Sequence, residues 1–237
     1  MAEMLTADQI FAELNAGSLR VKPETLPKLP RREGIFDTGL ATNGNGAHPS
    51  QIDLMIDNQS WNLSSNTNAA LGSSKVQGRD TNLAEKNHFV GEGEKFWGAG
   101  WSMKVTCPHT QLNNTTNVLA FVDEVRRARD LLTVEWQFNA GSYAFIRRPG
   151  RDVPFYMFTI VSSQLASAAT WFPYTIHSDG MLDLRIGPSR RMLYVEGIDN
   201  SRISLKFTIA SGQTILTPTV DIVYQFVFEG IRIVYRG

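Results

Sequence analysis

The residue types that can do chemistry are few in this chain, and they are poorly grouped. His177, Ser178 and Asp179 supply the three side chains of a serine-hydrolase triad, but triad members must converge from separate elements, and these three are consecutive. The stretch therefore predicts a turn. Cys107 and His109 could form half of a metal site, yet with 1 cysteine and 4 histidines none of the remaining ligands stands at zinc-motif spacing. We expect no catalytic triad and no metal.

A glycine-rich stretch at 91–101, GEGEKFWGAGW, has the composition of a nucleotide-binding loop but not its context. The dinucleotide fingerprint requires a strand, a glycine loop and a helix in one parallel unit, and no such unit follows. Glu92 and Glu94 could serve as the carboxylate pair of a glycosidase, but two acids this close in a loop favour solvated charge. We expect no cofactor and no enzymatic activity, and a β-sandwich hydrolase is the least favoured alternative.

Paired arginines are the most informative polar feature. A guanidinium binds a carboxylate of a neighbouring subunit, or a phosphate, in bidentate geometry. Lysine and arginine together number 23 and aspartate and glutamate also 23, which lacks the basic excess of a general nucleic-acid binder and favours protein contacts. With the apolar residues of the N-terminal region, the predicted inter-subunit contacts are Leu26, Leu29, Arg31, Arg32, Ile35, Phe36, Arg147, Arg148, Arg190 and Arg191.

Tryptophans next to polar stretches offer a different function. Trp97, Trp101 and Trp171 could stack on sugar rings, as in a carbohydrate-binding or host-recognition module, or they could belong to the core. This module is the main alternative to a protein-contact function.

The elements that would position these residues begin with a short helix at 6–16. Thr6 and Gln9 have the spacing of a capping box, and Leu5 and Ile10 that of a hydrophobic staple. Residues 18–50 are rich in proline and glycine with interspersed apolar residues, which predicts an extended arm lying along a surface. Residues 1–50 are thus interpreted as an N-terminal helix and arm.

Residues 51–237 are predicted to form a single antiparallel β-sandwich. Short strand-like runs separated by turn residues are expected at 51–56, 95–107, 133–138, 143–147, 154–162, 170–177, 181–186, 192–196 and 202–209. Long polar loops are predicted over 62–93, and apolar residues at helical spacing predict one internal helix at 117–132.

The chain ends in a β-like run at 220–237, VDIVYQFVFEGIRIVYRG, in which apolar residues move from even to odd positions at Glu229 and Gly230. This change indicates either a β-bulge or a two-residue hairpin that pairs Phe228 with Ile231. We favour the hairpin, because one continuous strand would be unusually long. We expect the apolar positions on both sides of the switch to form the last layer of the core, and the other face to meet the arm or a neighbouring subunit.

Composition also restricts the environment. One cysteine excludes an internal disulfide framework, and no apolar run approaches the length of a membrane span, so we expect a soluble protein made in the cytoplasm with no transmembrane segment.

A β-rich body, long polar loops, a capped helix and an apolar-dotted arm together resemble the jelly-roll capsid proteins of viruses and bacteriophages. The resemblance is architectural and implies a virion structural protein whose subunits self-assemble through arm and sheet edges, with copies of itself and other virion proteins as partners. Residues 1–40 hold five basic and six acidic residues, unlike the basic arms of capsid proteins that package RNA directly. We therefore expect no direct sequence-specific binding of nucleic acid.

Overall fold

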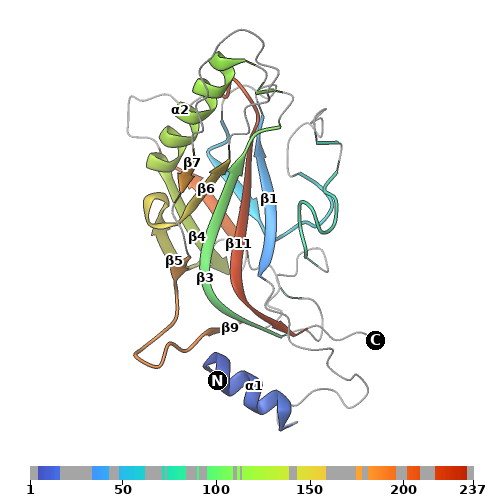
Figure 1. Cartoon of the computed structure of the whole chain (residues 1–237), viewed down its shortest axis with the longest axis vertical. Coiled ribbons are helices and arrows are strands. Elements are labelled where there is room, and N and C mark those ends of the chain that lie inside the picture. Colours follow the sequence, from blue (N-terminus) through green and yellow to red (C-terminus); the bar gives the residue numbers. More distant parts are fainter. Residues whose placement is uncertain are drawn as a thin grey trace.

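The structure, a computed structural model, describes residues 5–16, 34–42, 48–61, 71–72, 74–83, 90, 95–108, 111–112, 114–138, 143–158, 175–177, 181–195, 202–208 and 217–233. Within them the chain is mainly β, as predicted, and its strands form two sheets (Figure 1). The two sheets share one apolar core. The specific strand order of a jelly roll stays a prediction.

The larger sheet is built around two long neighbouring strands, β3 (Lys95–Thr106) and β11 (Ile222–Ile233). Its order is β1-β11-β3-β6-β7, and β8 and β9 also pair with β3. Its other strands are β1 (Ile35–Ala41), β6 (Phe155–Phe158), β7 (Thr175–His177), β8 (Leu182–Asp183) and β9 (Leu193–Val195). The pairing of β3 with β6 is parallel and the other pairings are antiparallel.

The smaller sheet has the order β2-β10-β4-β5, and all its pairings are antiparallel. Its strands are β2 (Gln51–Leu54), β4 (Leu132–Phe138), β5 (Tyr143–Pro149) and β10 (Arg202–Phe207). Alternate residues of β4 and β10 enter the core, and Trp136 meets Phe228 of the larger sheet edge to face at a centroid distance of 5.4 Å. These contacts between the sheets make the two layers one sandwich.

The internal helix α2 (Thr115–Leu131) covers one end of the sandwich, at the top of Figure 1. Its apolar face enters the main core through Val118, Phe121 and Val125, as its helical spacing predicts. The N-cap is Asn114, whose side chain accepts a hydrogen bond from the Asn117 backbone N–H at 2.8 Å. The helix therefore begins two residues before the predicted start.

The predicted hairpin at Glu229 and Gly230 is wrong. β11 runs continuously through both residues, and its register against β3 shifts there, since Glu229 pairs with Gly100 and Gly230 with Gly98. Ala99 is thus an extra residue on β3, which is a β-bulge. A Cβ on Gly230 would lie 2.2 Å from the Trp97 carbonyl oxygen, so only glycine fits this close crossing.

The buried apolar residues of β11 move from even to odd positions because a different face of the strand is covered after the bulge. Phe228 belongs to the main core, whereas Ile231 and Ile233, on the opposite face of the same strand, belong to a second apolar cluster. The expectation that these two isoleucines continue the last layer of the main core is therefore wrong. Val223 and Val227, on the second face nearer the start of β11, are half-buried.

Strand structure begins earlier than residue 50. β1 lies inside the predicted arm and pairs with β11 from Ile35 to Ala41, and Ile35 and Leu40 are buried. As an edge strand, β1 tolerates Gly39 within the paired segment, and the prolines of the predicted arm lie outside that segment. The described part of the arm at 35–41 thus belongs to the sandwich.

Candidate functional site

The residues predicted to contact other subunits fall into three groups in the structure. Leu26, Leu29, Arg31 and Arg32 lie outside the described residues. Phe36 is half-buried on β1, but Ile35 is fully buried in the main core, so the prediction that Ile35 contacts a neighbouring subunit is wrong. The error arose because the apolar spacing of an extended arm and that of an edge strand look alike in sequence.

The arginine pairs in the folded body are exposed. Arg147 and Arg148 lie on β5, the outermost strand of the smaller sheet, and the Arg147 Nε contacts Glu135 Oε1 at 2.5 Å. Arg190 and Arg191 lie in the turn between β8 and β9. One pair thus belongs to the smaller sheet, and the other to a turn between two strands of the larger sheet.

The proposed sugar-stacking tryptophans are core residues. Trp97 is 2% exposed and Trp101 0% exposed, so neither ring presents a face to a ligand. Trp101 packs edge to face against Phe226 at a centroid distance of 5.6 Å. The prediction that these two residues bind glycans is wrong, and Trp171 lies outside the described residues, as do Glu92 and Glu94.

The N-terminal helix α1 (Ala7–Asn15) forms a feature of its own at one end of the larger sheet (Figure 1). Its predicted capping box is confirmed, because Thr6 N–H donates to Gln9 Oε1 at 2.9 Å and Gln9 N–H to Thr6 Oγ1 at 3.2 Å. Leu5 and Ile10 are buried together, as the staple predicts.

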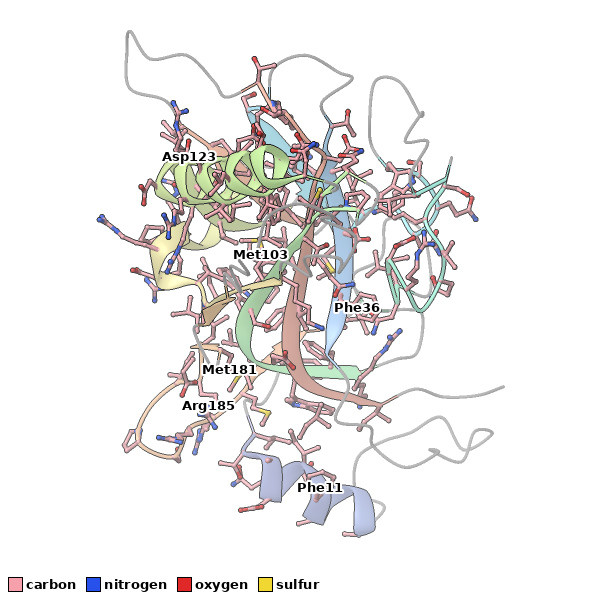
Figure 2. All side chains as sticks on the ribbon, turned by 45° about the horizontal axis from the view of Figure 1, so that its top comes forward. Phe11, Phe36, Met103, Asp123, Met181 and Arg185 are labelled. Atoms are coloured by element: carbon pink, nitrogen blue, oxygen red, sulfur yellow. The ribbon has the colours of Figure 1, made fainter. Side chains whose placement is uncertain are left out.

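α1 covers the second apolar cluster. The cluster joins residues of α1 to the bulged ends of β3 and β11 and to the segment before β9, and comprises Leu5, Ile10, Trp97, Ala99, Met192, Ile231 and Ile233. Phe11 and Met181 pack against it, and in Figure 2 Met181 lies between α1 and the sheet. The backbone is also tied there, since Met192 N–H donates to the Leu5 carbonyl at 2.9 Å. The helix thus docks on a surface separate from the main core.

The free edge of β1 is covered by residues 74–83, which we call the cover segment. Phe36 N–H donates to Asn82 Oδ1 at 2.7 Å, and Asn82 N–H donates to the Phe36 carbonyl at 3.1 Å. The Thr38 hydroxyl donates to the Asp80 carbonyl at 2.6 Å. These bonds occupy polar groups that an open edge strand would present to another strand, so this edge is closed.

A buried lysine–aspartate pair lies beneath the cover segment. Lys75 Nζ is 2.8 Å from Asp37 Oδ1, and the two side chains are 1% and 0% exposed. Asp37 Oδ2 accepts a hydrogen bond from Met55 N–H at 2.8 Å, and Lys75 Nζ also donates to the Asp57 carbonyl at 2.9 Å. Burial raises the pKa of Asp37 above its ordinary value, outweighing the opposing effect of Lys75.

A second polar cluster lies between α2 and the upper end of the larger sheet. His48 Nε2 is 2.9 Å from the Tyr224 hydroxyl, and His48 Nδ1 is 2.8 Å from the Pro49 carbonyl, so Nδ1 carries the proton and Nε2 accepts one from tyrosine. Burial lowers the pKa of His48 and raises that of Tyr224. Burial, together with the Asp221 and Glu124 carboxylates, raises the pKa of the Cys107 thiol to about 12.

These shifts determine what the second cluster can do chemically. At neutral pH the imidazole, the phenol and the thiol are all uncharged, so Cys107 is not a thiolate nucleophile. The buried hydrogen bond between His48 and Tyr224 therefore has a structural role at this end of the sandwich.

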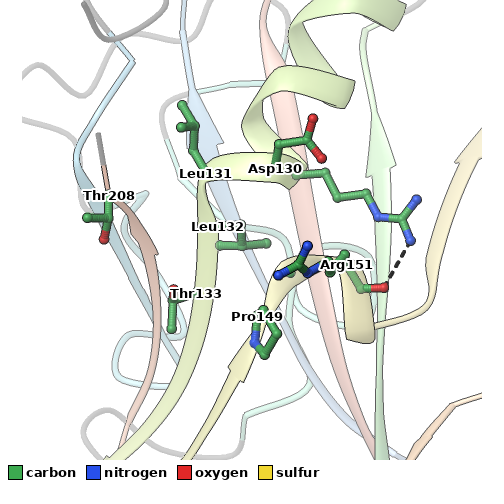
Figure 3. Close-up of a pocket in the computed structure, with 9 residues that line it drawn as sticks. Asp130, Leu131, Leu132, Thr133, Pro149, Arg151 and Thr208 are labelled. Carbon is green, nitrogen blue, oxygen red and sulfur yellow. Dashed lines mark hydrogen bonds between the residues drawn. The ribbon is translucent and has the colours of Figure 1, made fainter. Parts of the chain in front are cut away.

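An open groove of ≈ 360 Å³ lies at the C-terminal end of α2 (Figure 3). Its lining includes Arg129, Asp130, Pro149 and Arg151, and Arg129 Nη2 donates to the Arg151 carbonyl at 3.1 Å. A helix C-terminus carries negative partial charge, which opposes anion binding there despite the two guanidinium groups. The groove holds no arrangement of nucleophile and base.

The residues that the structure describes offer neither a metal site nor a membrane-spanning helix. No three potential metal ligands cluster among these residues. Neither of their helices is long and apolar enough to cross a bilayer.

Sequence reasoning missed Asp37 and Lys75. A weak signal existed for Asp37, which is the one charged residue of an otherwise uncharged run, IFDTGLA. No signal pointed to Lys75, because its burial depends on how a polar loop folds back over β1.

In comparisons with known proteins, no protein-family model, no curated protein and no solved structure matches the chain.

Proposed function

We propose that this protein is a virion structural protein, a capsid-type subunit that assembles with copies of itself through its N-terminal helix and arm. One observation carries the proposal: α1 docks on an apolar cluster of its own, on the opposite face of β11 from the main core. The sandwich core is complete without α1, which suits the helix to an exchangeable contact between subunits.

The docking surface is built for a helix that does not fold alone. α1 has nine residues, too few for stable helicity in water, so its capping box and buried Leu5 and Ile10 act only when the cluster receives them. A surface that exposed Trp97, Ile231 and Ile233 without α1 would be a contiguous apolar patch. One copy of α1, the subunit's own or a neighbour's, would cover this patch.

The segment between α1 and β1 is long enough for α1 to dock on its own subunit or on a neighbour. Residues 16–34 join α1 to β1, and 19 residues of extended chain span up to ~60–70 Å, more than the width of a domain of this size. Pro23, Pro27 and Pro30 disfavour a helix and favour extended chain in this stretch. Exchange of identical terminal elements between copies is a low-cost route to closed assemblies.

The sheet edges also favour contacts through the helix and arm over contacts through added strands. The edge of β1 is closed by the cover segment, whereas β5 pairs only with β4 in the described sheet and exposes Arg147, Arg148 and Pro149. Charge and proline on an edge oppose uncontrolled strand addition. Arm and helix are then the principal contacts, and the arginines of β5 suit acidic partners.

The test compares full-length protein with a variant lacking residues 1–33, which keeps Gly34 and all of β1. Light scattering and electron microscopy should show large regular oligomers for the full chain and a folded monomer for the variant. A variant lacking only residues 1–4 retains α1 and serves as the matched control, with assembly expected at the level of the full chain. A full-length protein that stays monomeric at every concentration and salt, or a shortened variant that assembles normally, would overturn the proposal.

A further inference from the structure

The buried pair of Lys75 and Asp37 has the arrangement of two groups poised to condense. The amine nitrogen and the carboxyl oxygen are 2.8 Å apart, and both side chains are removed from water. A buried lysine and a buried carboxylate are each costly as ions, and burying the pair repays that cost only in part. The site is independent of the assembly proposed above.

Burial in a low-dielectric interior disfavours charge on the Asp37 carboxyl group. Burial raises the pKa of Asp37 even with Lys75 in contact, so the carboxyl group is biased toward its protonated form. Movement of one proton from the ammonium to the carboxylate within the pair leaves a neutral amine beside a neutral acid. A neutral amine is a nucleophile, and a protonated carboxyl has water as its leaving group.

Both reacting groups are also held in position. Lys75 Nζ donates to the Asp57 carbonyl at 2.9 Å, and the Lys75 backbone N–H donates to the Gln59 carbonyl at 2.7 Å. Asp37 lies in β1 between β11 and the cover segment, within a regular ladder. Reactants that a fold holds in contact gain effective molarities up to the order of 10⁵–10⁸ M once they reach a near-attack geometry.

The second oxygen of Asp37 has its own donor. Met55 N–H donates to Oδ2 at 2.8 Å, and this N–H is aimed there by a left-handed backbone with φ 67°, which is rare for a residue other than glycine. Strained backbone of this kind concentrates at functional positions. A backbone N–H on Oδ2 stabilises the negative charge that this oxygen acquires in a tetrahedral intermediate.

We propose that Lys75 and Asp37 form an intramolecular isopeptide bond. The Nζ lone pair attacks Cγ of the protonated carboxyl, the C–N bond forms, and the Cγ–Oδ1 bond breaks. Oδ1 leaves as water after taking one proton from nitrogen in addition to the proton it already carries. The neutral acid and neutral amine thus become a secondary amide plus one water, with no oxidant, reductant or cofactor required.

The bond would join β1 to the cover segment covalently. It closes a loop between residues 37 and 75 and anchors the segment that occupies the free edge of β1. A cross-link over a loop of this size stabilises a fold by ~3–4 kcal/mol in the chain-entropy description. The edge would remain closed even when the surrounding hydrogen bonds open.

The experiment is mass spectrometry of purified full-length protein, denatured before measurement. We expect a chain mass one water below that of the sequence, and a tryptic branched peptide joining the segments around residues 37 and 75. The Lys75–Val76 bond should also resist trypsin, because an amidated lysine is not cleaved. A Lys75→Arg variant should show its full sequence mass.

The chain supplies an internal control in a second lysine–carboxylate pair. Lys206 Nζ is 2.7 Å from Glu135 Oε2, but the Lys206 side chain is 34% exposed, so this pair is in contact with water. Its two peptides should be recovered unlinked from the same digest. Full sequence mass in the folded wild-type protein, with the segments around 37 and 75 in separate peptides, would overturn the proposal without relying on any variant.

Discussion

Replacement of Ile10 by aspartate should detach α1 from the sandwich while the rest of the protein stays folded. Ile10 is 0% exposed in the second apolar cluster, and truncating such a side chain costs ~2–5 kcal/mol even before a carboxylate is buried in its place. That loss lowers the ratio of docked to undocked helix by roughly 30-fold to several thousandfold. Because α1 contributes nothing to the main core, the loss should remain local.

Hydrogen–deuterium exchange followed by mass spectrometry shows whether α1 undocks while the sandwich stays folded. Peptides covering α1 should lose protection in the Ile10→Asp variant, whereas peptides from the paired part of β11 should keep it. Ala12→Asp is the matched control, since it places the same charge on an exposed position of the same helix and should leave α1 protected. By the function proposed here, Ile10→Asp should also reduce assembly and Ala12→Asp should not.

Two outcomes would refute this reasoning. If α1 keeps its protection in Ile10→Asp, the helix is not held by the second cluster. If β11 loses protection together with α1, the two clusters form one cooperative unit, and the helix is not an exchangeable element.

Two further predictions concern ionisable side chains. Cys107, whose pKa is raised to about 12, should resist iodoacetamide at pH 8 in the native protein and react after denaturation. Rapid reaction of the native protein would contradict the raised pKa of this thiol. Burial opposes ionisation of Glu135, but Lys206, Gln137 and Arg147 outweigh this effect and lower the pKa of Glu135. The ionised carboxylate therefore stabilises the fold at pH values above its unfolded pKa of ~4.3, and this stabilisation is lost as the pH falls through the lower pKa of the folded state. Glu135→Gln should therefore lower the urea midpoint at pH 7, and the difference from wild type should shrink toward pH 3; an equal difference at both pH values would show that the ion pairs are not its source.

Local structure could largely be predicted from the residues. The capping box of Thr6 and Gln9 and the apolar face of α2 depend on contacts within a few positions, which is why both were found where the spacing indicated. The extended runs that became β3, β4 and β10 followed from their alternation and from the turn residues between them.

The assignment of faces could not be predicted. The switch of parity in β11 was correctly located at Glu229 and Gly230, but a hairpin and a bulge produce the same pattern along one strand. The extra residue, Ala99, lies more than a hundred positions away on β3, and the cover for Ile231 and Ile233 comes from α1. Sequence spacing on a single strand carries no information about either partner.

Propensity, capping and period act locally, so the residues alone indicate a mainly β chain with a capped terminal helix, one internal helix and a proline-rich arm. The folded structure was needed to show that Trp97 and Trp101 are buried, that Ile35 belongs to the core, and that Lys75 contacts Asp37 beneath the cover segment. Burial is a property of what the rest of the chain places over a residue. It follows from long-range packing, which the order of residues along one segment does not encode.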